Sequence, residues 1–165
     1  NCAPTLITQH MPPVFTRNLA VRLDKMCAPE VMEATIGAAL RPGTVYIAPG
    51  GELHLEVAGR STFACALKTG GPVNGHCPSI DRLFSSAARS LGPRAVGVLL
   101  TGMGRDGAQG LLEIRQAGGR TIAQDEATSI VYGMPKAAVE LGAVEVQHPI
   151  TRIGHALIEA TSART

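Results

Sequence analysis

The stretch "AVGVLLTGMGRDGAQGLLEIRQAGGRTIAQ", residues 95–124, decides the fold. It begins with a continuous apolar run at 95–101, which is typical of a strand buried on both faces of a sheet. A helical pattern over 107–118 follows and ends in two glycines, and a second strand-like run occupies 120–124. A strand, a helix and a strand in this order predict parallel strands joined by a helical crossover.

The same alternation extends in both directions along the chain. A strand-like run at 4–9 precedes apolar residues at helical spacing over 15–26. Ser79 is placed to cap a helix over 79–91, because its hydroxyl can accept a hydrogen bond from a backbone N–H of the first turn. Towards the C-terminus the pattern predicts a helix, a strand and a closing helix, at 135–142, 143–147 and 151–163.

The middle of the chain has a different pattern. Three strand-like runs, at 44–49, 53–57 and 61–68, are joined by short links that contain glycine. Links of this length predict antiparallel hairpins, since a parallel return needs about a dozen residues. We therefore expect one α/β domain over 1–165, with a mostly parallel, doubly wound (Rossmann-like) sheet and an antiparallel hairpin insertion.

Composition limits the classes of function. Hydrophobic residues make up 45% of the chain but aromatic residues only 3%, so the core must be aliphatic. A net charge of +2, without a run of Lys or Arg, argues against nucleic-acid binding. No apolar run reaches the roughly 20 residues that a membrane span needs, so we expect no membrane insertion. The four cysteines form no CxxC pair, which is typical of unpaired thiols in a reducing compartment, and we expect a cytoplasmic protein.

Two polar residues follow the ends of predicted strands. His10 comes after the first strand, and Asp106 comes after the strand at 95–101, where it starts the next helix. Sites in parallel sheets form outside the carboxyl ends of the strands, so the two side chains can meet if their strands are neighbours. The dipole of the helix N-terminus would keep Asp106 ionised. An ionised carboxylate fixes the tautomer of an imidazole, which then acts as a general base.

Other interpretations of these residues remain open. His10 can be a loop residue bonded to the backbone, and Asp106 can be the cap of a helix. The loop between Gly102 and Gly107 can bind phosphate, although "GMGRDG" has neither the Lys of a P-loop nor a dinucleotide fingerprint. The segment 74–81, "NGHCPSID", can line the site or only cap the following helix. The remaining histidines are His54, His76, His148 and His155. They show no metal-ligand spacing, so neither a metal nor a cofactor is expected.

Three long segments are more specific than any single motif. They are "ITQHMPPVFT" (7–16), "PVNGHCPSIDRLF" (72–84) and "VGVLLTGMGRDGAQGL" (96–111). Together they resemble the catalytic domain of chemotaxis-receptor protein-glutamate methylesterases, the CheB family, and the resemblance covers nearly the whole chain. It implies hydrolysis of glutamate methyl esters on methyl-accepting chemotaxis receptors, and deamidation of glutamine, by a Ser-His-Asp triad without a cofactor. It matches the family's histidine with His10 and its aspartate with Asp106. It also matches the family's loop methionine with Met103, which is expected, with Gly104, to support the oxyanion.

Two departures from the family's pattern bear on these expectations. The family's nucleophilic serine precedes the histidine in a glycine-rich turn, whereas only nine residues precede His10 and none of them is serine. We therefore expect the chain to be N-terminally incomplete and inactive alone. A receiver domain, which often precedes this domain in the family, is absent from 1–165. Arginines are common in the family at the positions of Gly75 and Cys77, which puts in doubt how charged substrate side chains are held there. The alternative functions are a non-catalytic interaction domain of the same fold and a phosphate- or nucleotide-binding module.

Overall fold

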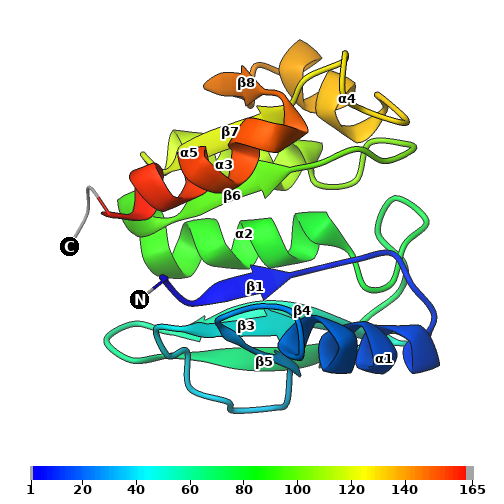
Figure 1. Ribbon diagram of the computed structural model, residues 1–165, viewed down its shortest axis with the longest axis vertical. Coiled ribbons are helices and arrows are strands. Elements are labelled where there is room, and N and C mark those ends of the chain that lie inside the picture. Colours follow the sequence, from blue (N-terminus) through cyan, green and yellow to red (C-terminus); the bar gives the residue numbers. More distant parts are fainter. Residues whose placement is uncertain (1, 163–165) are drawn as a thin grey trace. The chain divides into compact units, whose positions relative to one another are not determined.

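A computed structural model describes residues 2–162 of the chain. The chain divides into two compact units, Asn1–Leu83 and Phe84–Thr165, and the boundary lies inside helix α2 (Ile80–Leu91). Each unit contains a three-stranded sheet in which all pairs are parallel. The predicted α/β class with mostly parallel strands is thus confirmed, but the parallel strands are divided between two sheets where the pattern suggested one (Figure 1).

The parallel sheet of the first unit has the strand order β1-β3-β2. Its strands are β1 (Thr5–Ile7), β2 (Glu30–Glu33) and β3 (Thr44–Ile47). Helix α1 (Pro13–Asp24) lies between β1 and β2 in sequence and has a proline at its first position, where a backbone N–H would have no helical partner. Ala20 of this helix packs with Val31 and Ile47 of the sheet. This apolar contact holds α1 against the sheet and therefore sets where the β1–α1 link lies.

The prediction of antiparallel pairing in the middle of the chain is wrong for the run at 44–49. That run is β3, which pairs in parallel with both of its neighbours. Only β4 (Leu53–Gly59) and β5 (Phe63–Thr69) form an antiparallel pair. The glycine link after β3 is not a hairpin turn, because β3 and β4 belong to different sheets. The link is instead crowded by the backbone of another segment, since a Cβ on Gly50 would stand 2.5 Å from the carbonyl oxygen of Met11. Glycine at position 50 lets the β1–α1 link pass closely over it. The sequence pattern also does not reveal β2, whose four residues "EVME" have a glutamate at each end.

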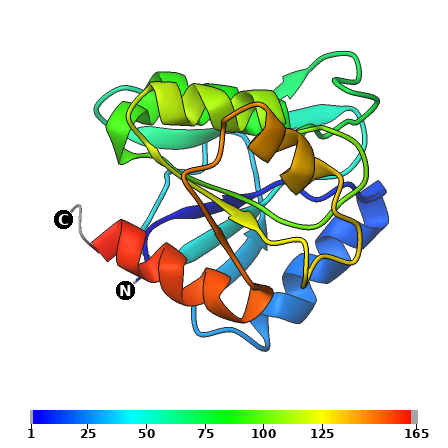
Figure 2. The ribbon, with the colours of Figure 1, turned by 90° about the horizontal axis from the view of Figure 1, so that it is seen from above.

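The second unit is a doubly wound α/β layer with strand order β6-β7-β8. Its elements after α2 are a 3₁₀ turn (Gly92–Arg94), β6 (Val96–Leu99), α3 (Ala108–Gln116), β7 (Arg120–Gln124), α4 (Met134–Glu140), β8 (Val146–His148) and α5 (Ile150–Ser162). On one face of the sheet, Val96, Val98 and Ile122 pack against α5. Gly97 points to the other face, where a Cβ would stand 2.6 Å from Leu111 of α3. Figure 2 shows α3 and α5 on opposite sides of the strands.

The predicted helices and strands of this half are confirmed, with ends that differ by a few residues. The predicted cap of α2 is also present, because the Ser79 hydroxyl accepts a hydrogen bond from the Arg82 N–H at 3.4 Å. Within residues 2–162, none of the helices has the length and apolar character needed to cross a membrane.

Candidate active site

His10 lies at the carboxyl end of the parallel sheet of the first unit. β1 ends at Ile7 and α1 begins at Pro13, so His10 belongs to the short link that leaves the sheet. It is half-buried and lines a pocket of about 460 Å³. The other described lining residues are Met11, Pro12, Pro13, Gly51, Gly75, His76, Cys77 and Pro78. The predicted position of His10 at a strand end is confirmed, and the structure adds the pocket around it.

A buried threonine ties together the segments that follow all three strands of this sheet. Thr16 of α1 is fully buried, and its hydroxyl accepts a hydrogen bond from the Gly50 N–H, beyond β3, at 3.0 Å. The hydroxyl proton is shared between Glu33 Oε1, at the end of β2 and 2.7 Å away, and the Pro13 carbonyl oxygen at 2.8 Å. These bonds fix the link that carries His10 relative to the other two strand ends.

Another wall of the pocket is a tight hairpin around Asn74 and Gly75. Both residues have positive φ, 50° and 81°, which is the signature of a type I′ turn. The Val73 N–H donates to the His76 carbonyl and the His76 N–H donates to the Val73 carbonyl, both at 3.0 Å. Asn74 Nδ2 also donates to Asp81 Oδ2 in the first turn of α2, at 2.6 Å. The hairpin therefore presents His76 from a fixed backbone position.

The imidazoles of His10 and His76 are stacked face to face. Their ring centroids are 3.6 Å apart and their planes differ by 4°. The sequence does not single out His76 as a site residue, because the segment 74–81 is interpreted more readily as the cap of the following helix than as the wall of a site. The Asn-Gly pair before it is a signal that could have found it, since Asn-Gly predicts a type I′ hairpin and hence an ordered residue at position 76.

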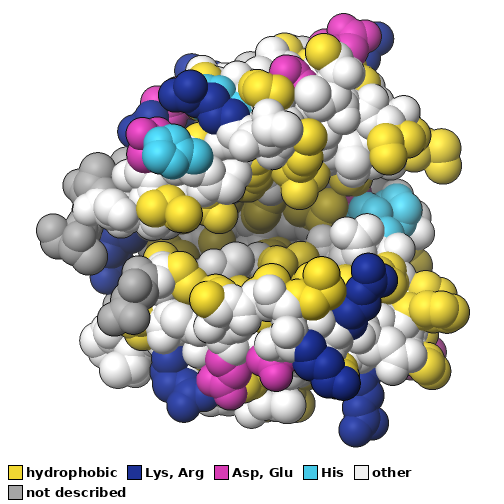
Figure 3. Space-filling view, viewed as in Figure 1, with side chains coloured by type: hydrophobic (Ala, Val, Ile, Leu, Met, Phe, Trp, Pro, Cys, Tyr) yellow, Lys and Arg dark blue, Asp and Glu magenta, His cyan; other side chains and the backbone are white. Residues whose placement is uncertain are grey.

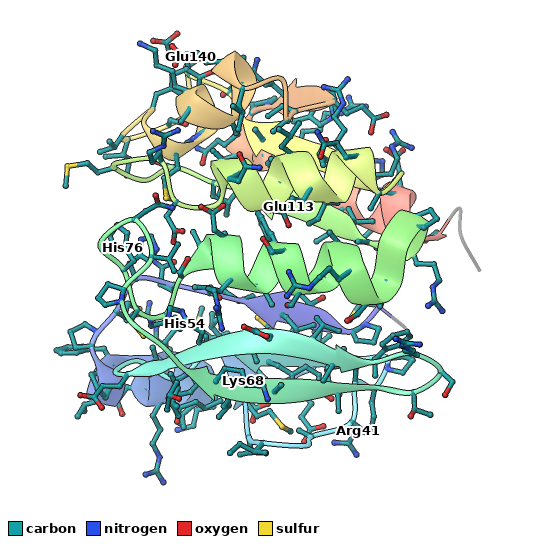
Figure 4. All side chains as sticks on the ribbon, turned by 180° about the vertical axis from the view of Figure 1, so that it is seen from behind. Arg41, His54, Lys68, His76, Glu113 and Glu140 are labelled. Atoms are coloured by element: carbon teal, nitrogen blue, oxygen red, sulfur yellow. The ribbon has the colours of Figure 1, made fainter. Side chains whose placement is uncertain are left out.

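A third histidine, His54 of β4, supports the hairpin from inside the fold. It is fully buried. Its Nδ1 accepts a hydrogen bond from the Ser79 N–H at 3.1 Å, and its Nε2 lies 3.2 Å from the Gly71 carbonyl oxygen. Figure 4 shows His54 on the strand and His76 on the loop above it. One ring therefore contacts both ends of the segment 71–79.

Cys77 lines the same pocket. Burial raises the pKa of its thiol, the nearby carboxylate of Glu52 raises it further, and Arg82 acts in the opposite direction. The thiol is therefore in its neutral form near neutral pH. None of the described residues that line the pocket is Lys, Arg, Asp or Glu, so its wall carries no permanent charge.

The second unit holds Asp106 in the loop between β6 and α3. Asp106 is fully buried. The prediction that it starts or caps the helix is wrong, because α3 begins at Ala108 and its cap position is Gly107. Gly107 has a φ of 90°, in the left-handed region that a right-handed helix cannot include, so the helix can start only after it.

The loop that contains Asp106 is braced by the segment before α4. The Thr101 hydroxyl accepts from the Val131 N–H at 2.9 Å and lies 3.1 Å from the Val131 carbonyl oxygen. A Cβ on Gly133 would stand 2.6 Å from the Gly102 carbonyl oxygen, so the two segments touch through their backbones. Met103, in the same loop, is 80% exposed. The neighbouring Gly104 has a φ of 92°.

The predicted site residues thus fall into two groups. His10 belongs to the first unit, and Met103, Gly104 and Asp106 share one loop of the second. The strand before His10, β1, and the strand before Asp106, β6, are not paired with each other: β1 pairs with β3, and β6 pairs with β7. The pairing of His10 with Asp106, and the oxyanion role of Met103 and Gly104, stay predictions.

The surface agrees with the modest net charge. On the face seen in Figure 3, Lys and Arg side chains are interspersed with acidic, hydrophobic and uncharged ones. A continuous basic surface for nucleic acid is therefore not present on that face.

Comparison with known proteins assigns the family. The sequence model of the CheB methylesterase family matches residues 1–157. Two relatives, from Agrobacterium fabrum and Caulobacter vibrioides, are 58% and 55% identical over 99% of this chain. They are named protein-glutamate methylesterase/protein-glutamine glutaminase, the Caulobacter protein with the suffix 1. The chain spans about half of their length, 47% of each.

A solved structure has the same fold. The crystal structure of the Thermotoga maritima CheB methylesterase catalytic domain superposes with a TM-score of 0.92. The match covers 96% of this chain and 85% of that one, at 38% sequence identity. Because the family model matches residues 1–157 and the fold agrees with that of a solved member, the chain belongs to the CheB methylesterase family.

Proposed function

We propose that the protein containing this chain hydrolyses glutamate methyl esters on methyl-accepting chemotaxis receptors and deamidates receptor glutamines. The observation that carries the proposal is the position of His10, which follows a parallel strand at its carboxyl end and lines a pocket of about 460 Å³. Membership of the family and the names of the relatives support the substrate class. The pocket wall without permanent charge suits a methyl ester or an amide, because both groups are neutral.

In the proposed reaction, a serine N-terminal to Asn1 attacks the ester carbonyl carbon. His10 accepts the serine proton, and Asp106 holds the imidazole in the required tautomer and stabilises the imidazolium. Backbone N–H groups near the serine turn, together with those at Met103 and Gly104, donate to the oxyanion. When the tetrahedral intermediate collapses, His10 returns the proton to the leaving oxygen and methanol departs. Water, deprotonated by His10, then releases the receptor glutamate from the serine. With a glutamine side chain the leaving group is ammonia.

The burial of Asp106 supports its assigned role. A carboxylate that only orients a base need not contact solvent or substrate, and Asp106 is fully buried. Its loop is also braced through backbone contacts, as at Gly102 and Gly133, so the carboxylate is held by a stiff segment. No step of this reaction calls for a cofactor. We further propose cytoplasmic action on the receptors and regulation by a receiver domain of the same protein, as the family resemblance implies.

The test uses the full-length protein and membranes that contain methylated receptors. Methanol release is measured for the His10→Gln variant and for a His155→Gln control, which changes an exposed histidine of α5. We expect a loss of about 10³-fold or more for His10→Gln, as for removal of a triad member, and unchanged turnover for the control. Turnover of His10→Gln within about twofold of the unaltered protein would reject the role of His10 as base.

A further inference from the structure

We infer that His76 is a positioning residue for His10: its stacked ring holds the His10 imidazole in the plane that proton transfer needs. The inference rests on the proposed function, in which His10 takes and returns a proton. The stack is the observation that carries it, with centroids 3.6 Å apart and planes 4° from parallel. At this separation the two rings are in van der Waals contact face to face. Rotation of either ring about its Cβ–Cγ bond would therefore break this contact.

His10 gains from such a neighbour because of where it lies. It is half-buried, on a link of five residues between β1 and α1, and it faces a pocket rather than a packed core. A flat ring laid against one face restricts the side-chain torsions without occupying the ring edge, where both nitrogens make their hydrogen bonds. A general base needs this arrangement, since a displacement of about 1 Å can lower a rate about 10²-fold.

His76 can hold another ring in place only if it is itself held. The type I′ turn at Asn74 and Gly75 and the paired backbone bonds between Val73 and His76 fix its backbone. The bond from Asn74 to Asp81 ties the turn to the start of α2. The turn, the paired backbone bonds and the bond to α2 therefore hold the four-residue hairpin that carries His76.

His54 fixes the same segment from its buried side. Because Nδ1 accepts the Ser79 N–H, that nitrogen carries no proton, and Nε2 carries the proton of the neutral ring. This Nε2–H donates to the Gly71 carbonyl, and Cys77 Sγ lies 3.5 Å from the same nitrogen. With its proton on Nε2, His54 cannot accept a proton from the Cys77 thiol. His54 is therefore not a base for Cys77, and the role left to it is to support the hairpin that carries His76.

The test compares three variants of the full-length protein: His76→Ala, His76→Phe and the control His155→Ala. We expect His76→Ala to lower kcat about tenfold to a hundredfold while KM stays within about twofold, because the base is misaligned but the pocket remains. His76→Phe restores most of kcat, since a flat ring returns to the same face. His155→Ala leaves both constants unchanged.

A second measurement does not depend on turnover. The ring protons of His10, observed by NMR in selectively labelled protein, are shifted upfield by a ring stacked above them. We expect the upfield shift to be lost in His76→Ala and to be larger in His76→Phe than in the unaltered protein. This readout applies also where the alanine variant is poorly folded, since the unaltered and phenylalanine proteins already test the stack.

The outcomes separate this inference from the proposed function. If His10→Gln abolishes turnover while His76→Ala leaves kcat unchanged, the positioning role is wrong and the function stands. If His76→Ala lowers kcat and His76→Phe does not restore it, the stack is not what matters, and the inference is wrong again. If His10→Gln leaves turnover intact, the role of His10 as base fails, and the positioning role of His76 fails with it even if the NMR shifts show the stack.

Discussion

Replacement of Gly50 by alanine should destabilise the first unit by an amount that follows from its surroundings. A Cβ at this position would stand 2.5 Å from the Met11 carbonyl oxygen, 2.6 Å from the Pro12 carbonyl carbon and 2.7 Å from the Pro13 nitrogen. These distances fall about 1 Å short of ordinary contact, and all three atoms are backbone, so no side chain can rotate away. Overpacking of this kind costs about 2 kcal/mol.

The displaced backbone also carries a hydrogen bond. The Gly50 N–H donates to the Thr16 hydroxyl at 3.0 Å, and its weakening adds about 1 kcal/mol. We therefore expect the free energy of unfolding of this sheet to fall by about 3 kcal/mol in Gly50→Ala. With a denaturant slope of about 2 kcal/mol per molar urea, the midpoint moves down by about 1.5 M.

The assay is urea unfolding of the full-length protein, read by hydrogen-exchange mass spectrometry on peptides from β1 and β3. The matched control is Gly71→Ala, because a Cβ on Gly71 would meet no atom within 4 Å and the residue has no positive φ. The control should be neutral or slightly stabilising, by up to about 1 kcal/mol, through the loss of chain entropy in the unfolded state. Equal urea midpoints for the two variants would show that the β1–α1 link can move away from a Cβ at position 50 at little cost. That result would refute the expected destabilisation.

Three further outcomes are expected. Thr16→Val should lower the free energy of unfolding by about 2 kcal/mol, because it removes the hydroxyl that joins three strand ends. Thr16→Ser keeps the hydroxyl and should lower it less. Urea unfolding measures both, and equal losses would contradict the role of the hydrogen bonds. Iodoacetamide should label the exposed Cys27 faster than Cys77, as followed by mass spectrometry. The labelling rate of Cys77 should keep rising above pH 9, because the pKa of its thiol is raised. Equal labelling rates of the two cysteines at pH 8 would contradict the expected order. Arg120 lowers the pKa of Glu145 below 4.5 through a hydrogen bond. The folded carboxyl therefore stabilises the fold above that pH and loses the contribution as the pH falls through its lowered pKa. Because both side chains are exposed, Arg120→Gln should cost less than about 1 kcal/mol at pH 7, and this cost should shrink as the pH is lowered below 4.5. Urea unfolding over this pH range checks it, and a loss of stability that does not change with pH would exclude the ion pair as its source.

The second unit was predictable because its pattern is local. β6 reads as a continuous apolar run since it is covered on both faces, by α5 at Val98 and by α3 at Gly97. The helix that follows ends at glycines, one of which, Gly118, has a φ of 82°. Each signal lies within a few residues of the feature that it predicts.

The features that were missed depend on contacts between distant segments. β3 pairs in parallel because α1 and β2 return the chain beside it, and the glycine after it serves a close passage by Met11 rather than a turn. His76 became a candidate only when its ring was found against His10, from a different loop. His10 could be predicted because a strand end is visible in sequence, whereas its neighbour across the pocket is not.

The Asn74–Gly75 turn also determines how this pocket would age chemically. Asparagine followed by glycine is the pair at which a side-chain amide most readily closes on the next backbone nitrogen and hydrolyses to a carboxylate. Here the Asn74 amide donates to Asp81 at 2.6 Å. Conversion of Asn74 to aspartate would replace this hydrogen bond by two carboxylates of like charge. Their repulsion would separate the hairpin from the first turn of α2. Old protein would then lose the ring that lies over His10 while His10 itself stayed chemically intact.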